Sequence, residues 1–338
     1  MSATTRRRAL HRFDAWAALA ASPIPSGQPA GRPLRIIVPF PAGGGTDVLA
    51  RVIADRLRGP LGSVIVDNRV GASGRIGVEA VKNAEPDGAT LLFTPDFLLT
   101  VFPHSFRNLA YNPLTDFAPV AIVARSALAL SAGPALPAEV ATVAQYLDWA
   151  RQNAKQAFFA TTSPGGTPHF VGVMLSRASG VALSPVHYKG GAPALQDLLG
   201  GQIPVSVNPI GEVLPYVKSG RIRVLATTGG ARSRYLPEVP TFAESGFRHD
   251  VAEAWLGFLA PARTPAATVA RLAAAIGEAA RAPETADNLH KFAMDSAGST
   301  PESFAATLRA DLDKWGSEGS HSDSIPFRDP DPEGSRHV

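Results

Sequence analysis

The chain has 338 residues, no cysteine and a formal net charge of +3. A chain of this length folds as one large domain or as two, with enough apolar residues for a sizeable core. The lack of cysteine excludes disulfides, thiolate zinc sites and cysteine nucleophiles. The charge surplus lies in residues 1–30, which hold four arginines and one aspartate. The balanced remainder gives no reason to expect a nucleic-acid partner.

The first 32 residues are expected to be an export signal and a linker. Residues 5–10 (TRRRAL) form a charged start in the twin-arginine style, and residues 15–22 (AWAALAAS) form a short apolar stretch. The segment from 23 to 33 is rich in proline and glycine. The alternative is a cytoplasmic tail without regular structure. We expect export and a periplasmic location.

Residues 35–57 predict a strand, a glycine-rich turn and a helix. The stretch 35–40 is apolar and β-rich, 43–45 are glycines, and apolar side chains from residue 48 onward have helical spacing. Thr46 and Asp47 are residue types that cap helix N-termini. A helix start carries unpaired N–H groups and a partial positive charge, so a small anion can bind there without Lys or Arg. The alternative is an ordinary turn whose glycines allow tight packing.

Common catalytic and phosphate-binding motifs are excluded. A P-loop needs Lys and then Ser or Thr after its last glycine, whereas Gly45 precedes Thr46 and Asp47. A dinucleotide fingerprint needs glycine where Val48 stands. A G-x-S-x-G elbow fails at Arg75, and no H-E-x-x-H occurs. We therefore expect no enzyme, no cofactor and no metal site.

The rest of the chain repeats the strand–turn–helix unit, which implies an α/β fold with ligand sites at strand C-terminal ends. Strands are expected at 64–68, 90–94, 157–161, 186–189, 203–208 and 254–261, and helices at 76–84, 143–154, 169–178, 193–199, 213–218, 265–281, 283–294 and 301–315. Residues 117–132 exceed the usual strand length and are expected to cross between two lobes, with 222–228 returning. A cleft between such lobes is a natural ligand site.

The expected domains follow from these crossings. Residues 1–32 precede the fold, and residues 316–338 are expected to be a disordered tail because Ser, Asp, Pro and Gly dominate there. The first lobe is expected to hold residues 33–125 and 245–300. The second is expected to hold residues 126–244 and 301–315.

Several spaced motifs together resemble the Bug/TctC family, the extracytoplasmic solute receptors of tripartite tricarboxylate transport systems. The motifs are IVPFPAGGGTD at 37–47, DNR at 67–69, GASG at 71–74, PDG at 86–88, DFAPV at 116–120, HYKGGAPA at 187–194, DLLGG at 197–201, RVLA at 223–226, LPEVPT at 236–241, ESG at 244–246 and WLGFLAPA at 255–262. The resemblance runs from about residue 35 to about residue 315.

The resemblance implies a two-lobed periplasmic-binding-protein fold of the type II, Venus-flytrap class. It also implies a monomer that captures a small carboxylate, largely through backbone amides, and delivers it to membrane transporter subunits. The positions that match the family's ligand site are Phe40, Gly43, Gly44, Asp47, Ser73, Thr94, Thr167, His169, Tyr188, Ala192 and Asn208. Asn208 departs from the family, which often has Asp there, so the accepted head group can differ.

Some roles stay open at this level. His169 is either a first-turn donor to the ligand or a packing histidine, and Asp47 either orients a water or caps its helix. Phe40 either packs or stacks on the ligand. A periplasmic sensor that signals to a partner without transport is the second reading of the function. An enzyme with the same cleft is the third.

Overall fold

The structure, a computed structural model, describes residues 32–106, 108–162, 165–188, 190–247 and 253–319. The expected export signal, apart from Arg32, and the chain after residue 319 therefore lie outside the described residues. Within these ranges no helix combines the length and the apolar character that a membrane crossing requires.

The first lobe is an α/β layer built on the strand order β2-β1-β3-β9-β4. β1 pairs in parallel with β2 and β3, while β9 pairs antiparallel with β3 and β4. Its elements are β1 (Leu34–Val38), α1 (Gly45–Leu57), β2 (Val64–Asn68), the 3₁₀ turn η1 (Ala72–Gly74), α2 (Arg75–Lys82), β3 (Thr90–Pro95), α3 (Phe97–Thr100), α4 (Phe102–Ser105), β9 (Glu253–Pro261), α9 (Ala266–Arg281), α10 (Pro283–Lys291) and β10 (Asp295–Ser296).

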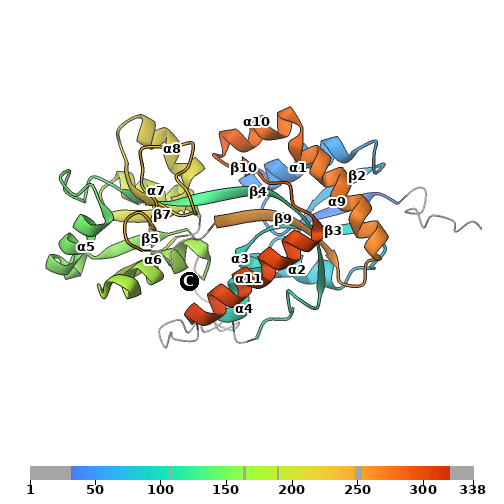
Figure 1. Cartoon of the computed structure of the whole chain (residues 1–338), viewed down its shortest axis with the longest axis horizontal. Coiled ribbons are helices and arrows are strands. Elements are labelled where there is room, and N and C mark those ends of the chain that lie inside the picture. The colour runs from blue at the N-terminus through green and yellow to red at the C-terminus, as the bar shows by residue number, and fades with distance from the viewer. Residues whose placement is uncertain (1–31, 107, 163–164, 189, 248–252, 320–338) are drawn as a thin grey trace, which may run out of the picture.

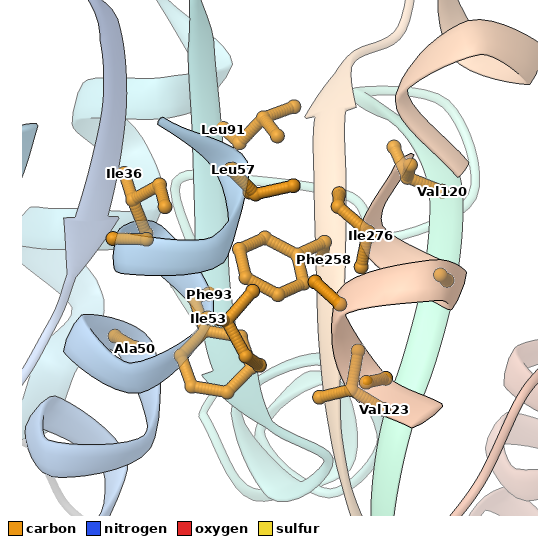
Figure 2. Packing of buried hydrophobic residues seen from close by; sticks show 14 of the residues in the cluster. Ile36, Ala50, Ile53, Leu57, Leu91, Phe93, Val120, Val123, Phe258 and Ile276 are labelled. Atoms are coloured by element: carbon orange, nitrogen blue, oxygen red, sulfur yellow. The ribbon is translucent and has the colours of Figure 1, made fainter. Parts of the chain in front are cut away.

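The core of this lobe lies on both faces of its sheet. Ile36 and Ile37 of β1 are both buried, but they belong to two different apolar clusters. This explains why β1 is a continuous apolar run rather than an alternating one. On one face, Phe93 of β3 stacks on Phe258 of β9 with ring centroids 4.5 Å apart, and helix α9 covers them through Ile276 (Figure 2).

The second lobe continues the same sheet with β7, β5 and β6, and β8 pairs with β4 beside them. β7 and β8 are antiparallel to β4, while β5 is parallel to β6 and β7. Its elements are α5 (Val143–Gln152), the 3₁₀ turn η2 (Ala154–Gln156), β5 (Phe158–Thr161), α6 (Thr167–Ser179), β6 (Ser184–His187), α7 (Gly191–Leu199), β7 (Val205–Pro209), α8 (Ile210–Lys218) and β8 (Arg223–Thr227).

Strand β4 (Phe117–Ala132) crosses between the lobes, as the sequence predicts (Figure 1). Its residues up to Ala127 pair with β9, and those from Leu128 onward pair with β7 and β8. The expected return at 222–228 is wrong, because β8 pairs only with the second-lobe half of β4. The chain reaches the first lobe again in β9, whose first residue Glu253 pairs with Ala127.

The last helix, α11 (Pro301–Gly319), extends past residue 315. The expectation that a disordered tail begins at residue 316 is therefore wrong for residues 316–319. The buried Phe304, Leu308 and Leu312 of α11 pack in a first-lobe cluster, although 301–315 were expected in the second lobe. Trp315 reaches the second lobe, where it meets Phe170 of α6 with ring centroids 5.4 Å apart. The helix therefore lies across the junction of the two lobes (Figure 1).

Candidate functional site

A cavity of about 530 Å³ lies between the lobes and receives three helix starts. The residues that line it at these starts are Gly45 and Thr46 of α1, Thr167 and Pro168 of α6, and Gly211 and Glu212 of α8. The first N–H groups of a helix have no partner within that helix. Donors and partial positive charge from both lobes therefore converge on one space.

The glycine turn before α1 is fixed by a buried carboxylate. Asp47, 2% exposed, accepts from the Gly43 amide at 2.8 Å and from Arg51 Nε at 3.0 Å through Oδ2. Its Oδ1 accepts from Asn68 Nδ2 at 2.9 Å, and the same amide reaches the carbonyl of Phe40 at 3.0 Å. Both carboxylate oxygens are thus engaged inside the protein.

This network decides the open question about Asp47 and corrects the role of Gly43. The N-cap is Gly44, without a side-chain cap, while Asp47 lies within the first turn and holds the residue before the cap. Gly43 was expected as a ligand-site position, but its amide donates to Asp47. Gly43 has φ of +85°, a conformation that favours glycine.

The same contacts set the protonation of Asp47. Burial by itself raises the pKa of this carboxyl, but hydrogen bonds from Arg51, Gly43 and Asn68 together outweigh it. The net pKa lies below its usual value, so the group is ionised at neutral pH. Its charge is compensated within the turn.

Helix α6 begins two residues before the expected 169–178, with Gly166 as N-cap and Thr167 as first helical residue. Pro168 has no N–H to offer. The His169 amide donates to the Gly166 carbonyl at 3.0 Å. The amide of Thr167 is therefore the main backbone donor of this turn.

His169 is a packing histidine in this structure. It is 6% exposed, its Nδ1 accepts from the Gly165 amide at 3.2 Å, and its ring contacts Phe159 and His187. Burial, followed by the proximity of His187, lowers the pKa of His169 to about 4. It does not line the cavity, so the alternative of a first-turn donor is not supported.

The start of α8 is a site feature that the sequence analysis missed. The helix begins at Ile210, three residues before the apolar pattern that predicted it. Pro209, directly before the helix, was the available signal. Glu212 in the first turn is held by Asn208, whose Nδ2 donates to Oε2 at 2.9 Å. Burial raises the pKa of Glu212, opposed by this hydrogen bond.

Asn208 therefore lies behind the cavity wall rather than in it. It is fully buried, accepts from the hydroxyl of Ser206, and orients a carboxylate that does line the cavity. Glu212, one helical turn after Asn208, brings a carboxyl group to the cavity wall. Gly191 makes room for that side chain, because a Cβ there would lie 1.9 Å from Oε2.

Several other expected site residues lie away from the cavity lining. Thr94 is buried in β3, and its hydroxyl donates to the Pro95 carbonyl at 3.2 Å. Tyr188 donates its hydroxyl to Asp197 at 2.6 Å. Ser73 is exposed in a left-handed conformation with φ of +57°, and Ala192 is exposed on α7. Phe40 and Thr167 are the two expected residues that line the cavity.

Apolar side chains form most of the remaining wall. They are Phe40, Pro95, Phe97, Ala124, Leu128, Pro209, Ala254, Trp255, Leu256, Phe292 and Met294. Phe40 both borders the cavity and packs against Phe97, with ring centroids 6.2 Å apart. Such a wall suits a ligand with an apolar body and few polar ends.

Four ionisable side chains border the cavity in addition to these groups. Asp96 is buried and Glu212 opens onto the space, while Arg125 and Lys291 supply positive charge. Arg125 is already close to Glu253, with 3.6 Å between Nη1 and Oε2. Lys291 is solvent-exposed, so water screens its charge.

A second cavity of about 630 Å³ lies elsewhere, between residues 103–114 and the end of α11. Its wall includes His104, Leu114 and Leu312, and no residue of the second lobe's sheet or helices borders it. The three helix starts described above do not reach it. The cavity between the lobes is therefore the candidate binding site.

Comparison with known proteins identifies the family. A family model described as tripartite tricarboxylate transporter family receptor matches residues 49–317. The chain belongs to this receptor family. Protein BugT of Bordetella pertussis is 33% identical over 307 residues, which cover 90% of this chain and 93% of BugT.

Solved structures confirm the expected two-lobed periplasmic-binding-protein fold of this receptor. The periplasmic binding protein BugD matches with a TM-score of 0.74 and 30% identity, over 86% of this chain and 97% of BugD. Rpa4515 of R. palustris, solved with adipate, matches with a TM-score of 0.76 and 30% identity, over 87% of this chain and 98% of its own.

We expect Asp47→Asn to destabilise the receptor by about 1–3 kcal/mol at neutral pH, because its buried donors lose a charged acceptor. In the wild type, the Asp47 carboxylate contributes fully to the free energy of unfolding above the ordinary aspartate pKa, about 3.9. This contribution is lost as the pH falls through the lowered pKa that Asp47 has in the folded protein. The stabilities of the two proteins should therefore converge in acid. Urea unfolding over a pH series measures this.

The matched control for this change is Asp55→Asn on the same helix. Asp55 pairs with Arg58, but its side chain is 63% exposed, so the effect should stay within about 0.5 kcal/mol. Equal losses for both variants would show that the Asp47 network does not hold the turn.

We expect Gly211→Ala to separate the lobes, because its Cβ would lie 2.1 Å from the carbonyl oxygen of Phe292 in the first lobe. Overpacking of this kind costs about 1–3 kcal/mol, and the radius of gyration should rise. Urea unfolding and small-angle X-ray scattering measure the two effects. The control is Gly230→Ala, where no atom lies within 4 Å of the new Cβ. A variant indistinguishable from this control would contradict the contact.

Proposed function

We propose that this receptor captures a small carboxylate in the cavity between its lobes and delivers it to a membrane transporter of the tripartite tricarboxylate class. Backbone amides at the helix starts bind the carboxylate, and the apolar wall covers the rest of the ligand. The protein acts by binding and release, without chemical conversion. The family, and the adipate in the structure of Rpa4515, support a carboxylate as ligand class.

The observation that carries this proposal is the position of the α1 start. Gly45 and Thr46 line the cavity, and they follow the turn that Asp47 fixes from behind. Their amides belong to the first turn of the helix and have no partner within it. Gly44, the N-cap, adds a third amide beside them. A carboxylate placed here meets donors and the positive end of the α1 dipole.

The second lobe completes the site when the lobes are closed. The amide of Thr167 and the first amides of α8 approach from the opposite side. Each hydrogen bond to a charged group contributes about 1.5–3 kcal/mol, so four give about 6–12 kcal/mol before the cost of ordering is subtracted. Burial of the ligand's apolar body then brings micromolar affinity, about −8 kcal/mol, within reach.

The family supports a proposal for location and partners. BugD is described as a periplasmic binding protein, and we place this receptor in the same compartment, as a monomer that docks on transporter subunits. The two lobes move as units about β4, with residues 33–125 and 245–300 in the first and 126–244 in the second. The pairing of β4 changes between Ala127 and Leu128, and this change supports a hinge at that point.

A carboxylate ligand should raise the thermal unfolding midpoint of the full chain. Stabilisation by mass action reaches about 2.7 kcal/mol at a ligand concentration of 100 Kd, enough for a shift of several degrees. We expect this from members of a panel of mono- and dicarboxylates that includes adipate and malate, and not from the matching alcohols and amides. A folded sample that no carboxylate stabilises would refute the proposed ligand class.

Gly45→Pro should remove one ligand donor and leave the helix start intact. Proline is well tolerated at the first helical position, and Gly44 already has the extended conformation that precedes proline, with φ of −73° and ψ of 163°. We expect the Kd of the bound carboxylate to rise about ten- to a hundredfold, measured by calorimetry.

The control for this change is Gly45→Ala, which keeps the N–H. Its Cβ would lie 3.9 Å from the ring of Phe292, an ordinary contact. The alanine variant should bind as the wild type does. Equal affinities for the alanine and proline variants would exclude the Gly45 amide as a ligand donor.

A further inference from the structure

The proposed function leaves one group in the cavity wall unexplained, the carboxyl of Asp96. Asp96 follows β3, lines the cavity and is 3% exposed. The hydroxyl of Thr167, from the other lobe, donates to Oδ2 at 3.0 Å. The backbone amide of Asp96 donates to the Trp255 carbonyl at 3.0 Å, which fixes the residue in place. This carboxyl therefore lies where an anionic ligand would be enclosed.

A charged Asp96 would oppose the capture of an anion. Two carboxylates enclosed in one apolar site cannot both stay ionised, and such pairs share one proton. A shared proton turns repulsion into a short, charge-assisted hydrogen bond. The neighbours of Asp96 in the wall, Phe97, Trp255 and Pro168, offer no charge to compensate it.

We propose that Asp96 is a specificity-determining residue that binds the ligand in protonated form, donating a hydrogen bond to the captured carboxylate, so that one proton is taken up with each ligand. This inference rests on the proposed function. It adds a side chain to a site otherwise described by backbone amides. The proton comes from solvent and returns to it when the ligand leaves.

The surroundings of Asp96 favour the neutral form before any ligand arrives. Burial raises the pKa of Asp96 to about 7, and the charge of Asp311 on α11 adds to this rise. Hydrogen bonds from the Thr167 hydroxyl and from the backbone amides of Phe97 and Asp96 oppose it without cancelling it. Asp311 itself accepts from Trp255 Nε1 at 2.8 Å. A ligand carboxylate would raise the pKa of Asp96 further, because it disfavours a second negative charge.

The other charged groups near the cavity do not take over the proposed role of Asp96 as a protonated donor to the ligand. On α8, Glu212 has its own donor in Asn208. On β4, Arg125 lies near Glu253 of β9, and on α10, Lys291 is exposed to solvent.

Histidines of the second lobe do not titrate in the relevant range. Burial lowers the pKa of His169 to about 4 and lowers the pKa of His187, so both are neutral above pH 7. Lys314 of α11 lies over the ring of Trp315, 5.0 Å from its centroid. A loss of affinity between about pH 7 and 8.5 would therefore report on a carboxyl with a raised pKa.

The contact with Thr167 links the protonation of Asp96 to closure of the lobes. Asp96 belongs to the first lobe and Thr167 to the second, so their hydrogen bond exists only when the lobes are together. Closure removes water from Asp96 and favours its neutral form. Ligand capture, closure and proton uptake should therefore occur as one coupled event.

The test is calorimetric binding of adipate to the full chain between about pH 6 and 8.5, a range in which free adipate is ionised. If adipate does not bind, the panel acid with the largest thermal shift takes its place. We expect the wild-type affinity to fall toward tenfold per pH unit above pH 7. Binding enthalpies in buffers of different ionisation enthalpy should show uptake of about one proton per ligand in the same range.

Two variants assign the proton. Asp96→Asn carries a permanent donor, so its affinity should vary less than about twofold over this range, with no proton uptake. Glu212→Gln should keep the wild-type pH profile. A pH profile that persists in Asp96→Asn and disappears in Glu212→Gln would overturn the assignment. An affinity of the wild type that rises with pH would also overturn the assignment, because Asp96 would then accept a hydrogen bond from the ligand rather than donate one.

A ligand-free measurement separates this inference from the proposed function. A raised folded pKa destabilises the native state as pH rises from about 4 to about 7, so the unfolding midpoint of the wild type should fall relative to Asp96→Asn over that range. If the unfolding midpoints of the two proteins change with pH in parallel, and adipate binding is still detected by calorimetry, then only the role of Asp96 is overturned. A receptor that binds no acid of the panel would overturn the proposed function and the ligand step together.

Discussion

The proposed site depends on a carboxylate that does not line the cavity. Asp47 is surrounded by the Gly43 amide, Arg51 and Asn68, and these contacts hold the turn between β1 and α1. An anion-binding helix start with an aspartate in its first turn would normally repel its ligand. Here the aspartate faces inward, its charge is compensated by Arg51, and the next amides are left for the cavity. The arrangement explains how an acidic residue can stand in the turn that we propose to bind an anion.

The second requirement is that both lobes contribute to one space. Strand β4 holds them together by pairing with β9 at one end and with β7 and β8 at the other, and α11 lies across the same junction. Two contacts then join the second lobe to the first. The backbone of Gly211 packs closely against the carbonyl of Phe292, and the hydroxyl of Thr167 donates to Asp96. The wall between the helix starts is mainly apolar, so few polar groups face the cavity. In such surroundings the charge of each polar group acts more strongly than it would in water.

Much of the fold and part of the site could be predicted from the sequence. Alternation of apolar runs and glycine turns is local, and it gave β1, α1 and the start of α6 within a residue or two. The long apolar run of β4 indicated the crossing. Pairing partners are not local, so the segment of β8 was wrongly expected to return to the first lobe. The hydrogen bond from the Gly43 amide to Asp47 was not predicted either. Asp96 was missed, although an acidic residue after a strand's C-terminal end was a signal.

The most direct test is a crystal structure of the full chain with the carboxylate that gives the largest thermal shift. The account predicts a closed protein in which one carboxylate group lies within hydrogen-bond distance of the Gly45 and Thr46 amides, about 2.7–3.2 Å, with the second lobe in contact with the same ligand. A ligand bound outside this cavity, or one whose carboxylate faces Arg125 and Lys291 while those amides contact only water, would contradict it.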